Sequence, residues 1–180
     1  MNRSRGKHNA EMPTEDAPSP FEILEHTADI GLRAHGRTLE ELFENAAWGL
    51  AEILDVGRPA QVIGAAAVDA GTPARSPSAR SRGAPAGYAP RPIRVVLEAA
   101  DVEALLVDWT NELILLTEEG KACLAEVRVE VVGEDGLRAR VDVVGCNPRA
   151  EGTELKAATY HQLAVRHADG GWEATLYFDV

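Results

Sequence analysis

Two short stretches of the 180-residue chain carry side chains that could bind a cation: 25-EHTADIGLRAHG-36 and the closing 177-YFDV-180. Alternation along a strand places Asp179 on the face opposite Phe178. If this segment pairs within a sheet, the Asp179 side chain and the terminal carboxylate lie within a few ångströms and repel each other unless a cation is bound. A third carboxylate would complete an oxygen cage suited to Ca²⁺, Mg²⁺ or Mn²⁺. The alternative is an exposed terminus.

The first stretch supplies a candidate for that third carboxylate. His26, Thr27 and Asp29 lie where the apolar run 21-FEIL-24 gives way to a segment with alternating pattern. Threonine and aspartate at such a junction can instead close a turn by bonding nearby backbone N–H groups. From the residues alone, both interpretations of Asp29 stay open.

A third polar group, 154-ELKAATYHQ-162, precedes a predicted strand, where functional loops are often found. The alternative is that Lys156 solvates a surface while Tyr160 packs and donates one hydrogen bond. The chain contains no nucleophile elbow, P-loop, dinucleotide fingerprint or HExxH motif. This disfavours an independent enzyme.

Hydrophobic periodicity predicts the elements that position these residues. Thr38 and Glu41 form a capping box before a helix at 39–54, and Asp101 caps a second helix. Alternation and turn signals predict strands at 30–36 and 93–99 and two hairpins, at 122–144 and 161–180. We expect an α+β fold, in which a mostly antiparallel or mixed β-sheet has two amphipathic helices packed on one face.

The domain organisation follows from composition. Residues 1–20 are predicted to be a disordered N-terminal extension, and 21–180 a single domain. The Ala-, Pro- and Arg-rich segment 57–92 lacks a sustained period of two or 3.6, so we expect a flexible insertion within that domain.

The charge distribution argues against nucleic-acid binding. The net charge is −11, and the segment 57–92 contributes +4 while 1–20 is neutral, so the rest of the chain carries −15. Such a surface repels a phosphate backbone. Cys123 and Cys146 are expected to be reduced thiols, and with no apolar run of membrane-spanning length the protein is expected to be cytoplasmic.

Three blocks in this order resemble the archease family: 26-HTADIGLRAHGRTLEELFENAAWGLAEIL-54, 101-DVEALLVDWTNELILL-116, and 154-ELKAATYH-161 with the closing 179-DV-180. The resemblance covers residues 21–56 and 93–180. It implies an archease-like fold and a role other than catalysis.

Archeases assist the RtcB-type RNA ligase, which joins RNA 2′,3′-cyclic phosphate or 3′-phosphate ends to 5′-hydroxyl ends. The resemblance implies that this chain promotes guanylylation and multiple turnover of such a ligase in tRNA splicing and RNA repair. From the charge and the lack of a long apolar run, we expect no stable binding to nucleic acid or membrane. The resemblance further implies a divalent cation, calcium with magnesium and manganese as alternatives, held by Asp29, Asp179 and the main-chain oxygen of Val180. His26 and Lys156 are expected to be nearby supports or partner contacts.

Two features depart from the family pattern. The text 145-GCNPRAEGTELKAATYH-161 lacks the Gly-Glu and the further histidine expected before the last block, and the insertion at 57–92 is not a family feature. Two other functions stay open. One is a chaperone-like folding or assembly modulator, which should expose a sizeable apolar patch. The other is a small metal-dependent hydrolase with His26 or His161 as base.

Overall fold

A computed structural model describes most of the predicted domain. The described residues are 19–25, 29–56, 89–120, 122–132, 136–145, 153–168 and 170–180. The helices are α1 (Leu39–Ile53) and α2 (Val102–Gly120). The strands are β1 (Phe21–Glu25), β2 (Asp29–Gly36), β3 (Arg91–Glu98), β4 (Ala122–Val132), β5 (Gly136–Gly145), β6 (Ala157–Ala168) and β7 (Gly171–Asp179). Residues 1–18 of the predicted extension at 1–20 and residues 57–88 of the predicted insertion lie outside this range.

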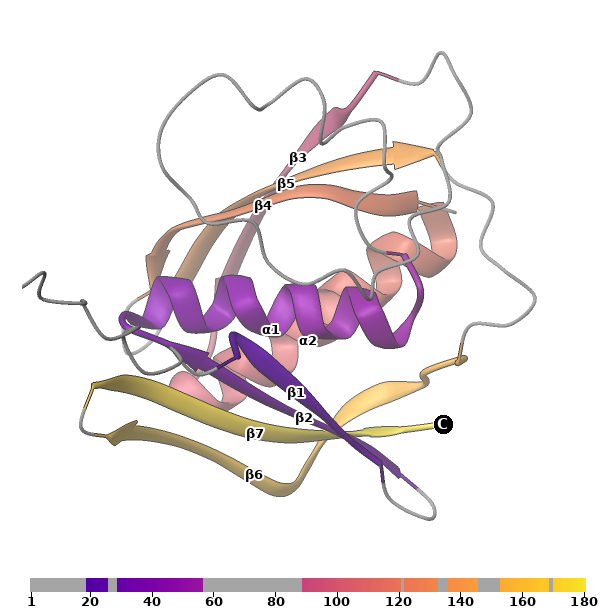
Figure 1. The fold of residues 1–180 in the computed structure, drawn as a ribbon. Helices are drawn as coiled ribbons and strands as arrows, with labels where there is room; N and C mark the ends of the chain where they lie inside the picture. Colours follow the sequence, from indigo (N-terminus) through magenta and orange to yellow (C-terminus); the bar gives the residue numbers. More distant parts are fainter. Residues whose placement is uncertain are drawn as a thin grey trace, which may run out of the picture.

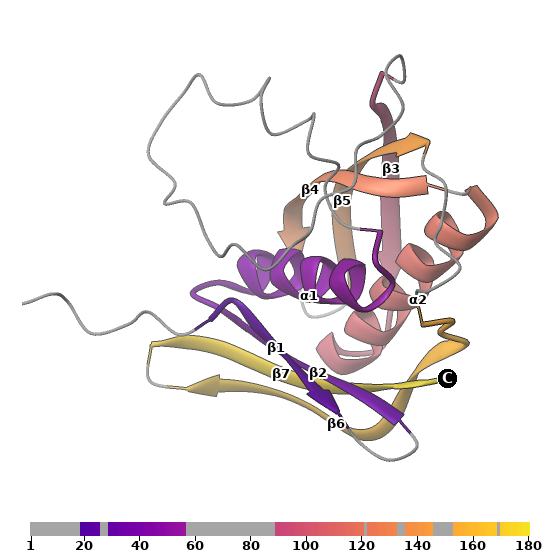
Figure 2. The same cartoon turned by 45° about the vertical axis from the view of Figure 1, so that its right-hand side comes forward.

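The strands form two antiparallel sheets with both helices between them (Figures 1 and 2). The four-stranded sheet has the order β1-β2-β7-β6, and the three-stranded sheet has the order β3-β5-β4. The α+β class, the antiparallel pairing and the two helices are therefore confirmed. The sequence did not indicate that the strands divide into two sheets, each with one face toward the helices. Neither described helix is long and apolar enough to cross a membrane.

The core lies between the layers and is built from the predicted apolar faces of the helices. On α1 the buried side chains include Leu42, Phe43, Ala46 and Leu50, and on α2 they include Leu105, Leu106, Trp109 and Leu113. The indole of Trp109 is fully buried, and its Nε1–H donates to the Phe43 carbonyl oxygen at 3.0 Å. This bond satisfies the one polar atom of the largest core side chain and joins the two helices.

Both predicted helix caps are confirmed. The Thr38 hydroxyl accepts from the Glu41 N–H at 3.2 Å, and Asp101 Oδ1 accepts from the Ala104 N–H at 2.8 Å. The return half of the capping box differs, because Glu41 Oε2 accepts from the N–H of Arg37 at 2.9 Å instead of that of Thr38. The first turn of α1 is thereby tied to the end of β2.

Helix α1 approaches the end of β2 closely enough to exclude any side chain there. A Cβ at Gly36 would lie 2.3 Å from the Leu42 nitrogen and 2.7 Å from the Leu42 Cα. Gly171, at the start of β7, has φ +148°, and a Cβ there would lie 2.2 Å from the Gly36 oxygen. These two glycines let the helix and both strands meet backbone to backbone.

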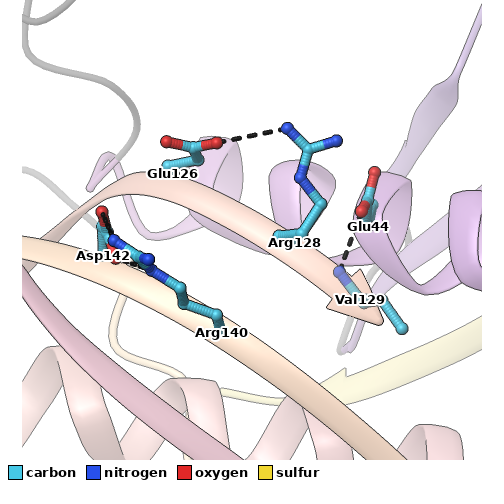
Figure 3. Close-up of polar contacts among 6 residues, drawn as sticks. All are labelled: Glu44, Glu126, Arg128, Val129, Arg140 and Asp142. Atoms are coloured by element: carbon cyan, nitrogen blue, oxygen red, sulfur yellow. Dashed lines mark hydrogen bonds and ion pairs between the residues drawn. The ribbon is translucent and has the colours of Figure 1, made fainter. Parts of the chain in front are cut away.

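The outer edge of β4 is covered by α1 (Figure 3). The N–H of Val129 donates to Glu44 Oε1 at 2.8 Å, and that of Val132 donates to Glu40 Oε1 at 3.4 Å. Hydrogen bonds from its own N–H, from the Thr38 hydroxyl and from Val132 lower the pKa of Glu40, against the opposing effect of burial. Two carboxylates of α1 therefore accept hydrogen bonds from N–H groups at the edge of β4. These N–H groups could otherwise pair with a strand of another chain.

We expect Glu44→Ala to lower the free energy of unfolding by about 1 kcal/mol, because it leaves the Val129 N–H without its partner. In a chain of this size that corresponds to a fall in Tm of roughly 2–4 °C. Glu52→Ala on the exposed side of α1 is the matched control, and Glu44→Gln, which keeps an acceptor oxygen, should recover part of the loss. Equal melting of the two alanine variants would contradict the assignment.

The cysteine prediction is wrong for Cys123, which is disulfide-bonded. In the β4–β5 register Cys123 pairs with Val144, so the hairpin brings it to the end of β5. Cys146 lies outside the described residues. Strand β3 also begins at Arg91, inside the segment predicted to be a flexible insertion.

Candidate metal centre

The two predicted carboxylate ligands lie opposite each other in the four-stranded sheet. Asp29 is the first residue of β2 and Asp179 the last residue of β7, and they are direct antiparallel partners. Partners of this kind have Cβ atoms about 4.5–5.5 Å apart and project from the same face. On β7 the neighbouring Phe178 is fully buried while Asp179 is exposed, as the alternation predicted. Both carboxylates therefore project from the face that the helices do not cover.

Lys156 attaches the segment before β6 to the end of β7. Its backbone N–H donates to the Asp179 carbonyl oxygen at 2.9 Å, and its Nζ donates to the Val180 main-chain oxygen at 2.8 Å. The start of β2, the segment before β6 and the end of β7 thus bring together the predicted residues Asp29, Lys156, Asp179 and Val180. His26, the fifth residue of the prediction, lies outside the described residues.

Asn111 on α2 positions this segment and was not among the predicted site residues. Its Oδ1 accepts from the N–H of Ala158 at 2.8 Å, two residues after Lys156. Leu155 is almost fully buried on the other side of Lys156. The sequence signal for this role was a polar side chain, Asn111, among the apolar positions of α2. A buried polar side chain needs a hydrogen-bond partner. The helix thereby fixes the strand end that carries the Lys156 contact.

The last residues of the third predicted polar group, 160–162, lie on the same sheet in a bulge of β6. The β6–β7 register shifts between Thr159 and Ala164, and Gln162 in the bulge has φ +53°. The His161 ring meets the Tyr177 ring edge to face at 6.3 Å between centroids. Tyr160 does not pack as the structural alternative required, because it is 62% exposed. The bulge turns the Tyr160 side chain outward. Regular pairing of β6 with β7 would have kept this side chain in the alternating pattern of the strand.

The geometry of Asp29 and Asp179 suits a cation but does not form a complete cage. Like charges directly opposite each other on a sheet destabilise it, and a cation between them removes that cost. Within the described ranges, no three His, Cys, Asp or Glu side chains come together as a ready-made metal cluster. The donors are two carboxylates and the main-chain oxygen of Val180, all hard oxygens of the kind that Ca²⁺, Mg²⁺ and Mn²⁺ take together with water.

The Lys156 ammonium already interacts with one of these donors. A carbonyl oxygen has two lone pairs, so the Val180 oxygen can accept from Lys156 and still face a cation. Two cations in one place repel, however, and Lys156 should weaken binding if its ammonium does not move away. The two carboxylates and the Val180 oxygen therefore fit a site that would bind a divalent ion with moderate affinity.

The chain is similar to known proteins over most of its length. The chain matches the family model described as "Archease protein family (MTH1598/TM1083)" over residues 21–69 and 85–180. It is 34% identical over 167 residues to the protein archease of Methanosarcina acetivorans, covering 89% of this chain and 95% of that protein.

Two solved structures are similar in fold. Protein 1598 of Methanobacterium thermoautotrophicum has a TM-score of 0.55 and 26% identity, covering 89% of this chain and 99% of that one. A Thermotoga maritima structure described as an archease and possible chaperone has a TM-score of 0.54 and 21% identity, covering 97% and 100%. At that identity the second likeness concerns the fold alone.

Proposed function

Because the chain belongs to the archease family, we propose that it activates an RtcB-type RNA ligase through a divalent cation held between β2 and β7. In this proposal it promotes guanylylation and multiple turnover of the ligase in tRNA splicing and RNA repair. It acts in the cytoplasm and performs no catalytic step itself. The observation that carries the proposal is the register that sets Asp29 opposite Asp179.

Each residue near the cation has a distinct task in this proposal. Asp29 and Asp179 bind the ion through their carboxylates, and Lys156 orients the Val180 oxygen as the third donor. Asn111 keeps the Lys156 segment against β7. When bound, the ion neutralises the carboxylates and offers further coordination positions to an oxygen of the ligase. Calcium is the expected ion, and the same oxygens accept magnesium or manganese.

The test is RNA ligation by the RtcB-type ligase of the same organism, supplied at a substoichiometric amount with GTP and Mn²⁺. We expect many turnovers per ligase when this protein is present and few when it is absent. A parallel single-round reaction, with ligase in excess over RNA, shows that the ligase is active without help. Equal multiple turnover with and without the protein would overturn the proposal.

The chaperone-like alternative has less support. A chaperone needs a contiguous apolar surface. In the part of the chain that the structure describes, the exposed large apolar side chains lie on separate elements: Ile23 on β1, Val96 on β3, Leu115 on α2, Tyr160 on β6, and Val180. Such scattered exposure is normal for a protein surface. Suppression of aggregation of an unrelated unfolded protein would be the corresponding test.

A further inference from the structure

The uncovered face of the four-stranded sheet contains a hollow of about 260 Å³. Its floor is made by two small side chains that pair across the strands, Thr175 on β7 and Ala164 on β6. Larger side chains rise around it: Arg33 from β2, Arg166 from β6, and Tyr177 at one end. The hollow exists because small residues stand in the middle of the sheet while long ones stand on both sides.

The two arginines flank β7 from its neighbouring strands. Thr175 pairs with Arg33 on one side and with Ala164 on the other, and Arg166 lies two residues beyond Ala164. Adjacent strands are about 4.8 Å apart and each residue advances about 3.4 Å along a strand, so the backbones of Arg33 and Arg166 are roughly 12 Å apart across β7. Side chains as long as arginine can converge above Thr175 from that separation.

These arginines keep most of their hydrogen-bond donors available. Arg33 has one long contact, from Nη1 to Glu22 Oε2 at 3.4 Å, and its side chain is 39% exposed. Arg166 is exposed, and the structure gives it no hydrogen bond or ion pair within the described residues. A guanidinium has five N–H donors and no acceptor. The hollow is therefore lined by two guanidiniums, of which Arg33 makes one long ion pair with Glu22 and Arg166 lies opposite Glu173 in the sheet register.

On the other sheet, two arginines each contact an acidic residue of their own strand (Figure 3). Arg140 donates from Nε and Nη2 to the two oxygens of Asp142 at 2.9 and 3.1 Å, and Arg128 bonds Glu126 at 3.3 Å. Both acceptors are on the arginine's own strand, two residues away. Arg128 serves as a control, being an exposed arginine of the other sheet whose single contact with Glu126, at 3.3 Å, is about as long as the 3.4 Å contact that Arg33 makes.

The remaining lining residues define the chemistry of the occupant. Gln162 adds an amide from the bulge, and the Thr175 hydroxyl adds a donor from the floor. Glu173 also lines the hollow, but its Oε2 faces His35 Nδ1 at 3.6 Å. Donors arriving from several directions suit a tetrahedral oxyanion, and arginine recognises phosphate through paired N–H groups. The volume is just below the roughly 300–1,000 Å³ of pockets for drug-sized ligands, so the occupant is small.

We propose that this hollow binds a phosphate monoester, with Arg33 and Arg166 holding its oxygens from opposite sides of β7 and Thr175 donating from the floor. The phosphate belongs either to a small molecule or to the end of an RNA. The proposal does not depend on ligase activation, because it concerns a different part of the sheet from Asp29 and Asp179. The overall charge of −11 opposes anion approach, so affinity is weak and comes from the local donors.

The test is a titration followed by NMR amide shifts, using inorganic phosphate, adenosine 5′-monophosphate, and a short RNA with either a 3′-phosphate or a 3′-hydroxyl end. We expect binding that Arg166→Ala weakens at least tenfold and that Arg128→Ala leaves unchanged. Glu173→Gln should tighten it a few-fold by removing a negative charge from the rim. Melting curves of each variant, which should coincide with the wild type, verify the fold.

The probes distinguish the source of the phosphate. Similar affinity for phosphate and the monophosphate assigns a small ligand, whereas preference for the 3′-phosphorylated RNA assigns an RNA end. No shift around Thr175 with any probe, or equal losses in Arg166→Ala and Arg128→Ala, would overturn the proposal. Because ligase turnover is not measured, these outcomes are independent of the proposed function.

Discussion

Asp29→Ala should reduce ligase turnover to the level of the ligase alone while leaving the fold intact. Asp29 is the first residue of β2, its side chain projects from the uncovered face, and its partner Asp179 is also a carboxylate. Its removal therefore takes away a cation ligand and a like-charge contact without opening the core. The change in free energy of unfolding without metal should stay within about 0.5 kcal/mol, as for surface substitutions in general.

Thermal melting with and without Ca²⁺ separates this effect from misfolding. An ion at about 100 times its Kd stabilises the wild type by about 2.7 kcal/mol, or roughly 5–10 °C in Tm for a chain of this size. The Asp29→Ala variant should show no such shift. Asp108→Ala, at an exposed position of α2, is the control and should keep both the shift and the activation. A variant that melts far below the wild type, with no ion shifting either protein, would defeat the prediction.

Gly36→Ala should produce the largest loss of stability, about 3 kcal/mol or a fall in Tm of roughly 6–12 °C. The added Cβ would meet the Leu42 nitrogen at 2.3 Å and the Leu42 Cα at 2.7 Å. Both atoms belong to the backbone of α1, so no side chain can rotate away. The first turn of α1 would have to leave β2.

Two other glycines provide controls for that variant in chemical or thermal unfolding. A Cβ at Gly136 would lie no closer than 3.6 Å, to the Leu97 oxygen, so Gly136→Ala should change stability little. At Gly49 the close atom is Leu32 Cδ1 at 2.4 Å, the end of a side chain, and alanine gains about 1 kcal/mol of helix propensity. Gly49→Ala should therefore cost less than Gly36→Ala. If Gly49→Ala lowered the free energy of unfolding more than Gly36→Ala, the backbone contact between α1 and β2 would have adjusted to the added methyl group at little cost.

Local pattern was enough to predict most elements of this fold. Apolar spacing and caps located α1 and α2, and turn signals located the β4–β5 and β6–β7 hairpins. These features depend on residues within one or two turns of each other. The division into two sheets depends on which strands pair with each other. That pairing is determined by packing against the helices, which are distant in sequence from many of the strands.

The candidate metal centre was predictable only in part. Alternation placed Asp179 on the face opposite Phe178, but its pairing with Asp29 is a long-range register that local pattern does not specify. The contact of Asn111 with Ala158 is long-range in the same way. The β6 bulge gave no signal, because glutamine at Gln162 is not among the residues that usually adopt positive φ.

The pairing of β2 with β7 also has a consequence for biosynthesis. Asp29 and Asp179 are 150 residues apart in the chain, and the four-stranded sheet joins a hairpin from each end of the described domain. During translation the β1–β2 hairpin emerges long before its partner exists, and contacts so distant in sequence form slowly. The pair of Asp29 and Asp179 is thus completed only when both hairpins have been made, so the ion-dependent Tm shift predicted above would also report that both hairpins have been synthesised and joined.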